Sequence, residues 1–398
     1  MSNSYEHRIG TDKVQIKAAN GQPVANTEVT VRQVKGSVSF GCAAFETLNT
    51  VNGLKKGEEL KNAERVVDNM LEIFDFFTLP FYWGRFEPVR GKPMTKETIK
   101  AAKWLRERGR TVKGHPLCWH TVCADWLLEF SDEEILKKQL ERIKRDVTDF
   151  KGIIDIWDVI NEVVIMPVFD RYDNAVTRIC KMEGQVGLVK KVFDEARHAN
   201  PDAVLLINDF DMSTDYSDLV QKLLDAGVCI DAIGLQSHMH QRIWPIEKTH
   251  EVLERFSKFG LPLHFTEINL VSGDLMPAHI VDLNDFVPDE WPSTPDGLER
   301  QAKQIVEFYT ALFECPLVEA VTYWSFADGG WLNAPTGLVT KEGHKKPAYD
   351  ALYDLLHKQW RTPEMKVKTD ESGYVEINGF RGDYVAQFSD GEMKFTLN

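Results

Sequence analysis

Eight short segments rich in apolar and β-branched residues alternate with eight amphipathic segments along most of the chain. The predicted strands are residues 39–44, 73–79, 111–118, 153–160, 203–208, 231–236, 262–267 and 319–325. The predicted helices are residues 58–71, 95–109, 131–150, 184–199, 214–226, 247–259, 296–314 and 346–358. Strands that alternate with helices form parallel sheets, and eight such units close into a barrel. We therefore predict an α/β fold with a (β/α)8 TIM barrel over residues 39–360.

The two ends of the chain carry β patterns without intervening helices. Residues 8–35 and 364–398 alternate between apolar and polar side chains around turns that contain glycine. Neither piece is large enough to stand alone, so we predict that residues 1–38 and 361–398 form one small β-sandwich module. The alternative is separate strands attached to the bottom of the barrel. Because the module has few aromatic side chains, we expect it to brace the barrel rather than bind polysaccharide.

Composition excludes several classes of partner. The net charge of −14 disfavours nucleic acid and anionic lipid, and no run approaches the roughly 18 apolar residues of a membrane span. The first eight residues resemble no secretion signal, which predicts a cytoplasmic protein unless the natural protein has a leader that this sequence lacks. The six cysteines follow no framework spacing, so we expect them to be reduced. Oligomeric state cannot be predicted from these features.

Two glutamates each end a predicted strand. Glu162 closes the run Ile-Trp-Asp-Val-Ile-Asn-Glu, and Glu267 closes His-Phe-Thr-Glu about a hundred residues later. A single such acid is more often an exposed helix cap. Two acids at the tips of the fourth and seventh strands would face each other across the barrel mouth. Retaining glycosidases use two catalytic carboxyl groups about 5–5.5 Å apart, of which one is protonated and the other ionised.

Histidines and tryptophans gather near the same strand ends. His115 and His238 follow the third and sixth predicted strands. A single histidine is usually a satisfied core residue, but two on the same face favour a site that orients a carboxylate. Sugars stack their C–H faces on indole rings, which suits the tryptophans at strand ends. These are Trp83, Trp119, Trp126, Trp244, Trp291, Trp324 and Trp331, whereas Trp104 and Trp360 are assigned to packing.

From about residue 40 to residue 356 the chain resembles glycoside hydrolase family 10, the retaining endo-β-1,4-xylanases. The motifs that carry the resemblance are Gly114-His115…Trp119-His120, Trp157 to Glu162, Leu206 to Asp209, Gly234 to His238, Thr266-Glu267 and Trp324…Asp328…Trp331. The resemblance implies a xylan or xylo-oligosaccharide substrate and no cofactor or metal. It implies Glu162 as acid/base and Glu267 as nucleophile. The substrate-binding residues that we assign with it are Asn161, His115, Trp119, Asn208, Gln236, His238, Trp324, Trp331 and Tyr82.

The chain departs from the family pattern beside the cleavage centre. A Glu-Asn…Lys set that usually binds the next sugar on the non-reducing side is replaced by Thr78, Leu79 and Tyr82. A Gln is replaced by Val122 and a Tyr by Phe210, and the Asp two places past the nucleophile is Asn269. Loss of groups that bind hydroxyls changes substrate preference strongly. Short or decorated xylo-oligosaccharides, or a different β-glycoside, are therefore alternatives to long xylan. We expect the long segment 271–294 to wall the leaving-group side.

Two other classes of protein remain as rivals. A metal-dependent barrel hydrolase could draw ligands from His115, His120, His238, His240 and His264, because His238-x-His240 has a ligand-like spacing. A non-catalytic carbohydrate-binding barrel would fit the apolar substitutions near Tyr82, but such a barrel is expected to lose one of its acids. Both acids are present, which favours the glycosidase.

Overall fold

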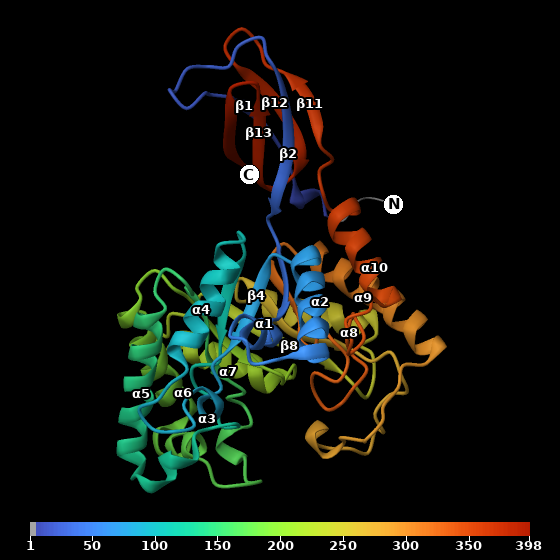
Figure 1. Cartoon of the computed structure of the whole chain (residues 1–398). Helices are drawn as coiled ribbons and strands as arrows, with labels where there is room; N and C mark the ends of the chain where they lie inside the picture. The colour runs from blue at the N-terminus through green and yellow to red at the C-terminus, as the bar shows by residue number, and fades with distance from the viewer. Residues whose placement is uncertain (1–4) are drawn as a thin grey trace.

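A computed structural model describes residues 5–398 and contains a closed barrel of eight parallel strands (Figure 1). Each predicted barrel strand overlaps one that is observed, so the predicted TIM barrel is confirmed. The last strand pairs with the first, which closes the barrel in the order β10-β3-β4-β5-β6-β7-β8-β9. The strands are β3 (Ser39–Ala43), β4 (Phe76–Pro80), β5 (Thr111–His115), β6 (Ile156–Asn161), β7 (Val204–Asp209), β8 (Ala232–Met239), β9 (Leu263–Leu270) and β10 (Val318–Tyr323).

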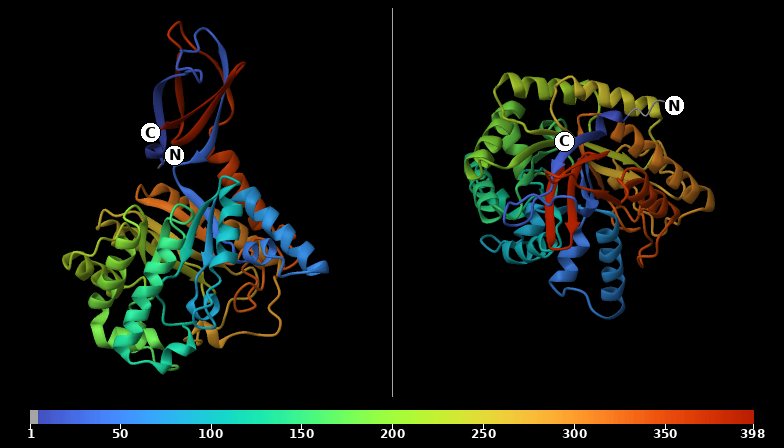
Figure 2. Two further views of the ribbon diagram at one scale, coloured as in Figure 1. Left: turned by 60° about the vertical axis from the view of Figure 1, so that its left-hand side comes forward. Right: turned by 90° about the horizontal axis from the view of Figure 1, so that it is seen from above.

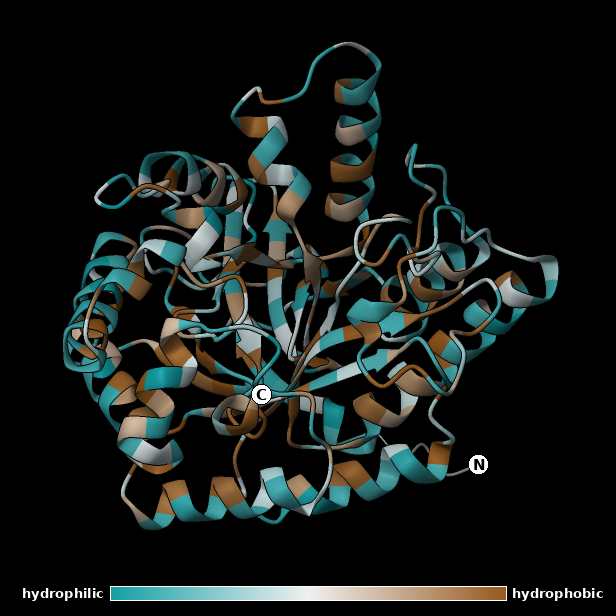
Figure 3. Ribbon diagram, turned by 90° about the horizontal axis from the view of Figure 1, so that it is seen from below, coloured by the Kyte–Doolittle hydropathy of each residue, from teal (hydrophilic) through white to brown (hydrophobic). Residues whose placement is uncertain are grey.

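Amphipathic helices form a ring around these strands, and each carries both apolar and polar residues (Figure 3). At the start of α5 the predicted capping box is present: the Glu134 backbone N–H donates to Ser131 Oγ, and the Ser131 N–H donates to Glu134 Oε2. The helices at the predicted positions are α2 (Gly57–Ile73), α4 (Thr95–Arg106), α5 (Asp132–Asp149), α6 (Ala175–Ala199), α7 (Thr214–Asp225), α8 (Ile246–Ser257), α9 (Pro295–Glu314) and α10 (Pro347–Asp354).

Three helical features differ from the prediction. The short helices α1 (Phe45–Val51) and α3 (Trp83–Phe86) were not predicted. Helix α6 begins at residue 175 instead of 184, because Asn174 caps it by accepting a hydrogen bond of 2.8 Å from the Thr177 backbone N–H. Gly184 lies inside this helix with φ 72°, a left-handed conformation that kinks it, so the glycine marks a kink and not the start.

A glycine on β5 allows this strand to pack closely against β6, the strand that leads to Glu162. A Cβ atom at Gly114 would lie 2.2 Å from the ring of Trp157 on β6, closer than atoms can approach. Trp157 is fully buried, so its ring occupies the space that a side chain at position 114 would need. This close packing holds the end of β5, with His115, against the start of β6.

The two chain ends pair with each other, as predicted. Strand β1 (Ile9–Gln15) runs antiparallel to β12 (Tyr374–Phe380), and β2 (Glu28–Gly36) lies between two C-terminal strands. The second sheet has the order β11-β2-β13-β14, with β11 (Met365–Lys368), β13 (Gly382–Phe388) and β14 (Gly391–Leu397). Buried side chains from both sheets form a separate small core of Ile16, Val29, Val31, Val375, Ile377, Tyr384, Ala386 and Leu397. The module boundaries at residues 38 and 361 stay predictions, and residues 1–4 lie outside the described part of the chain.

The module projects from the end of the barrel where its strands begin (Figures 1 and 2). Strand β2 ends at Gly36 and leads almost directly into β3, which begins at Ser39, so the module lies at the N-terminal face. The helices α1 and α2 form a hairpin, coloured blue in Figure 2, that projects beyond the helical ring. The strand ends that carry Glu162 and Glu267 therefore face away from the module.

Within residues 5–398, no helix has the length and apolar character needed to cross a membrane. All six cysteines are free thiols, and Cys42, Cys118 and Cys180 are buried. This agrees with the expectation that they are reduced.

Candidate active site

A large hollow of about 2300 Å³ lies at the C-terminal ends of the barrel strands. Segments that follow each of the eight strands contribute to its lining, which is the usual location of a TIM-barrel site. All but one of the predicted site residues line this hollow: Tyr82, His115, Trp119, Asn161, Glu162, Gln236, His238, Glu267, Trp324 and Trp331.

Glu162 follows the last residue of β6 in a left-handed backbone conformation with φ 58°, which is rare outside glycine. Its backbone N–H donates to the Asn208 carbonyl at 2.8 Å, which fixes this sharp turn. The side chain points into the hollow, where Oε2 accepts a hydrogen bond of 2.7 Å from Trp119 Nε1. Burial and the nearby Glu267 raise the pKa of Glu162 to about 8, so this carboxyl is mostly protonated at neutral pH.

Glu267 lies within β9 and is only 4% exposed. Its Oε1 accepts a hydrogen bond of 2.9 Å from Asn208 Nδ2, and its Oε2 lies 3.2 Å from His238 Nε2. His115 Nε2 lies 3.8 Å from Oε1 on the other side. Each oxygen of the Glu267 carboxyl group thus has a nitrogen partner within 3.2 Å.

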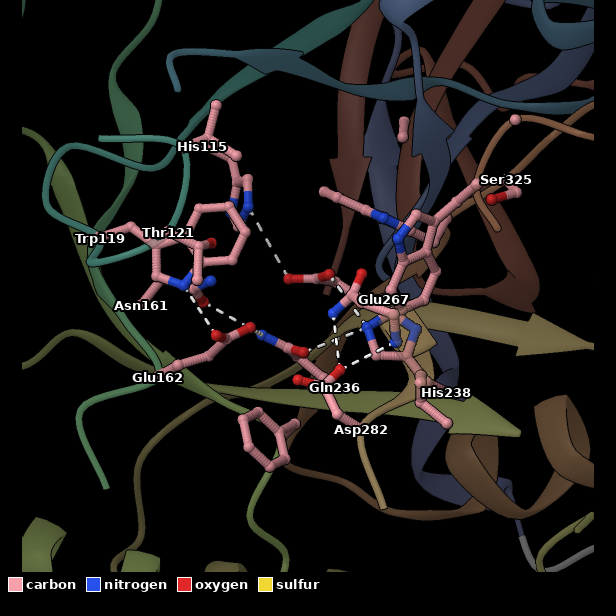
Figure 4. A pocket seen from close by; sticks show the side chains of 18 of the residues that line it. His115, Trp119, Thr121, Asn161, Glu162, Gln236, His238, Glu267, Asp282 and Ser325 are labelled. Carbon is pink, nitrogen blue, oxygen red and sulfur yellow. Dashed lines mark hydrogen bonds and ion pairs between the residues drawn. The ribbon is translucent and has the colours of Figure 1, made fainter. Parts of the chain in front are cut away.

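A short chain of hydrogen bonds connects the two carboxyl groups across the hollow (Figure 4). Gln236 Nε2 donates to Glu162 Oε1 at 3.3 Å, and Gln236 Oε1 lies 3.1 Å from His238 Nε2. The same His238 nitrogen contacts Glu267, so one amide and one imidazole separate the two acids. Such a pair supplies a proton donor and a nucleophilic carboxylate to one bond.

Asn208 is the predicted binding residue that does not line the hollow. It is fully buried, and its Nδ2 donates to both Asn161 Oδ1 (2.8 Å) and Glu267 Oε1 (2.9 Å). Its Oδ1 accepts from the Thr266 hydroxyl at 2.6 Å. Because its polar atoms already have partners beneath the surface, we interpret Asn208 as a residue that positions Asn161 and Glu267. The sequence motif marked Asn208 as a substrate-binding residue but could not show that its contacts are with other side chains.

Beneath the hollow, Asp158 organises a buried charge cluster. Its Oδ2 accepts from Lys113 Nζ and from His115 Nδ1, both at 2.7 Å. Burial alone would raise the pKa of Asp158, but the Lys113 ammonium and the His115 ring hold it at about 2. An ionised Asp158 requires a proton on His115 Nδ1, which leaves Nε2 facing Glu267 and the hollow.

Asn269 is the partner of His238, with 2.7 Å between Asn269 Oδ1 and His238 Nδ1. The contact fixes the orientation of the ring, so that Nε2 reaches Glu267. An amide at this position orients the histidine without adding a negative charge beside the two carboxyl groups.

Two residues near the site were not predicted from the sequence. Phe45 lies two positions after the end of β3 and lines the hollow, where no polar signal marked it. Asp209 follows Asn208, is fully buried, and accepts backbone N–H bonds from Val164 and Asp211 at 3.0 Å. Burial raises the pKa of Asp209 to about 7. Its place in the Asn-Asp pair after a strand was the available signal.

The expected tryptophans separate into two groups. Trp119, Trp244, Trp324 and Trp331 line the hollow. Trp83, Trp126 and Trp291 are not among the lining residues. Trp83 and Trp126 pack edge to face on each other, with 5.7 Å between ring centroids, and Trp291 packs edge to face on Phe286 at 5.1 Å. Of the long segment after β9, residues 281–285 line the hollow. Residues 5–398 contain no group of three or more His, Cys, Asp or Glu side chains arranged to hold a metal ion.

The model of one protein family, glycosyl hydrolase family 10, matches residues 57–355, about three quarters of the chain. The chain belongs to glycosyl hydrolase family 10. This confirms the resemblance inferred from the motifs and makes the protein a glycoside hydrolase of the xylanase type.

Several family 10 proteins are similar to this chain. An endo-1,4-beta-xylanase B from Thermotoga neapolitana is 26% identical over 79% of this chain and 90% of its own length. A beta-1,4-xylanase from Dictyoglomus thermophilum is 32% identical over 61% of this chain and 69% of its own length. The crystal structure of xylanase 10B from Thermotoga maritima superposes with a TM-score of 0.65 at 25% identity, covering 81% of this chain and 96% of that one. The match therefore covers the barrel and leaves the specificity of the site open.

Proposed function

We propose that this protein hydrolyses β-1,4-xylosidic bonds in xylan or xylo-oligosaccharides with retention of anomeric configuration. Glu162 is the acid/base and Glu267 is the nucleophile. The observation that carries the proposal is the hydrogen-bonded connection between the two carboxyl groups, one with a raised pKa and the other held by two donors. The xylanase names of the relatives support the choice of sugar.

The reaction proceeds in two displacements. The Glu267 carboxylate attacks the anomeric carbon and forms an ester bond, while the bond to the leaving oxygen breaks and Glu162 gives that oxygen its proton. Esterification removes the negative charge of Glu267, one of the causes of the raised pKa of Glu162. The pKa of Glu162 therefore falls, and Glu162 stays ionised after it has given up its proton. In the second displacement it takes a proton from water, while the water oxygen attacks the same carbon and the ester bond to Glu267 breaks.

The test is the anomeric configuration of the first product from a xylo-oligosaccharide, followed by NMR. Retention is expected, and an inverted product would overturn the mechanism. E267A is expected to lose about a thousandfold or more in turnover while it still binds the oligosaccharide. The matched control is E299A, on the exposed face of α9, which should behave like wild type. Unchanged turnover in E267A would exclude Glu267 as the nucleophile.

One observation favours short xylo-oligosaccharides over long xylan as the substrate. Thr78 and Leu79 are fully buried, so neither reaches the hollow, and Tyr82 contributes an aromatic ring there. Thr78 and Leu79 therefore bring no polar group to the side of the site where the next glycone sugar would lie, although Arg85 beyond Tyr82 does line the hollow.

A further inference from the structure

Four aromatic rings close one half of the barrel mouth. Trp324, Phe45, Tyr82 and His115 come from the ends of β10, β3, β4 and β5, which are neighbours in the barrel. Each ring contacts the next, and the last contacts the first. The centroid distances are 5.6 Å for Trp324–Phe45, 5.9 Å for Phe45–Tyr82, 5.7 Å for Tyr82–His115 and 5.1 Å for His115–Trp324. We call these four residues the aromatic box.

The other half of the mouth is polar. Asn161 and Glu162 lie at the end of β6, Gln236 and His238 lie in the second half of β8, and Glu267 lies within β9. A sugar attacked by Glu267 lies between this polar half and the aromatic box. Its leaving group would lie beside Glu162, on the side of the hollow that Phe210, Arg242 and Trp244 line.

Three of the four rings of the box are almost fully buried. His115 is 1% exposed, Trp324 8% and Tyr82 9%, whereas Phe45 is partly exposed. Phe45 also stands at the start of the α1–α2 hairpin, whose Glu46, Lys55, Glu59 and Asn62 line a further part of the hollow. The ring of Phe45 thus separates the position of the sugar next to Glu267 from the polar part of the hollow that the α1–α2 hairpin lines, which we call the α1–α2 crevice.

We propose that the aromatic box ends the glycone side of the site at a single sugar, so that the enzyme removes one terminal sugar from the non-reducing end of short β-glycosides. The inference rests on the proposed function and adds the mode of attack. A second glycone sugar would have to occupy the space of Phe45 and Tyr82. Its hydroxyl groups would also lose water against the ring of Phe45, which offers no hydrogen bond in return, and this is unfavourable.

The experiment compares 4-nitrophenyl β-xyloside with 4-nitrophenyl β-xylobioside and follows the first products of xylotetraose. We expect kcat/KM for the xyloside to equal or exceed that for the xylobioside, and xylotetraose to give xylose and xylotriose. A tenfold or larger preference for the xylobioside, or xylobiose as the first product, would overturn the inference while leaving the retaining mechanism intact. Cleavage of none of these compounds would contradict the proposed function as well.

Removal of one ring provides a second readout. F45A opens the box toward the α1–α2 crevice, so kcat/KM for the xylobioside relative to the xyloside is expected to rise about tenfold. The matched control is F259A, at the end of α8 and away from the hollow, which should keep the wild-type ratio. An unchanged ratio in folded F45A would show that Phe45 does not limit the glycone. If F45A does not fold, the wild-type products still decide the question.

Discussion

Glu162 has two unusual properties. Its backbone is in a left-handed conformation, and its carboxyl group is protonated at neutral pH, where most glutamates are ionised. The turn carries the side chain from the end of β6 into the hollow, where Trp119 and Gln236 hold its two oxygens. Burial and the charge of Glu267 then retain the proton.

This arrangement predicts the basic limb of the pH profile. Since the protonated form of Glu162 is active in the first displacement, kcat/KM for an unactivated xyloside should fall above about pH 8, roughly tenfold per pH unit. The measurement is the pH dependence of kcat/KM. A 2,4-dinitrophenyl glycoside, whose leaving group needs little protonation, should show a much weaker basic limb and serves as the control. A basic limb near pH 5 would contradict the assignment.

At this scale the sequence predicted the two acids and most of the residues that line the hollow with them, but not the contacts among these residues. Glu162 and Glu267 were found because each ends an apolar run, a pattern that needs no long-range information. Phe45 was missed because a phenylalanine after a strand carries no chemical signal until its neighbours are known. The buried position of Asn208 depends on Thr266 and Asn161, which lie far from it in sequence.

At the scale of elements, ion pairs join two of the loops that line the hollow. Arg171, on the segment after β6, contacts Asp282 and Asp285 on the segment after β9, at 2.5 Å for Asp285. These segments span the ends of β7 and β8, which lie between them in the barrel. The strands and most helices were predictable from periodicity, but this bridge was not, because both partners lie in segments without a periodic pattern.

Loss of these ion pairs should weaken the binding of leaving-group sugars more than it lowers the stability of the fold. Its side chains are 34–54% exposed, so solvent and salt screen the ion pairs. R171A is expected to raise KM several-fold for xylotetraose, leave KM for the aryl xyloside nearly unchanged, and hardly alter Tm. High salt should bring wild type toward the variant. R178A, which removes the Arg178–Asp132 pair of similar exposure on another part of the surface, is the control. Equal effects on both substrates would show that the bridge does not border the leaving group.

For the whole molecule, the small module and the hollow occupy opposite ends of the barrel (Figure 1). The module is held there by Arg8, which is 6% exposed and donates to the carbonyls of Phe313 (3.1 Å), Cys315 (2.6 Å) and Val318 (2.9 Å). Phe313 also stacks on Trp360 with 4.0 Å between ring centroids, beside Phe380 of the module. The sequence predicted that the two ends pair, but the docking by Arg8 depends on contacts about 300 residues apart.

Removal of the Arg8 side chain should lower the stability of the protein without changing its catalytic activity. R8A leaves carbonyl groups at the end of α9 and the start of β10 without their charged donor, which costs about 2–4 kcal/mol. Unfolding in urea should therefore begin at lower denaturant, and trypsin should cut the module faster. R32A, which removes an exposed arginine of the same module, should leave both unchanged. Because the module lies opposite the hollow, kcat/KM of R8A below its Tm should equal that of wild type. A fall in kcat/KM without loss of stability would mean that the module acts on the site and does more than brace the barrel.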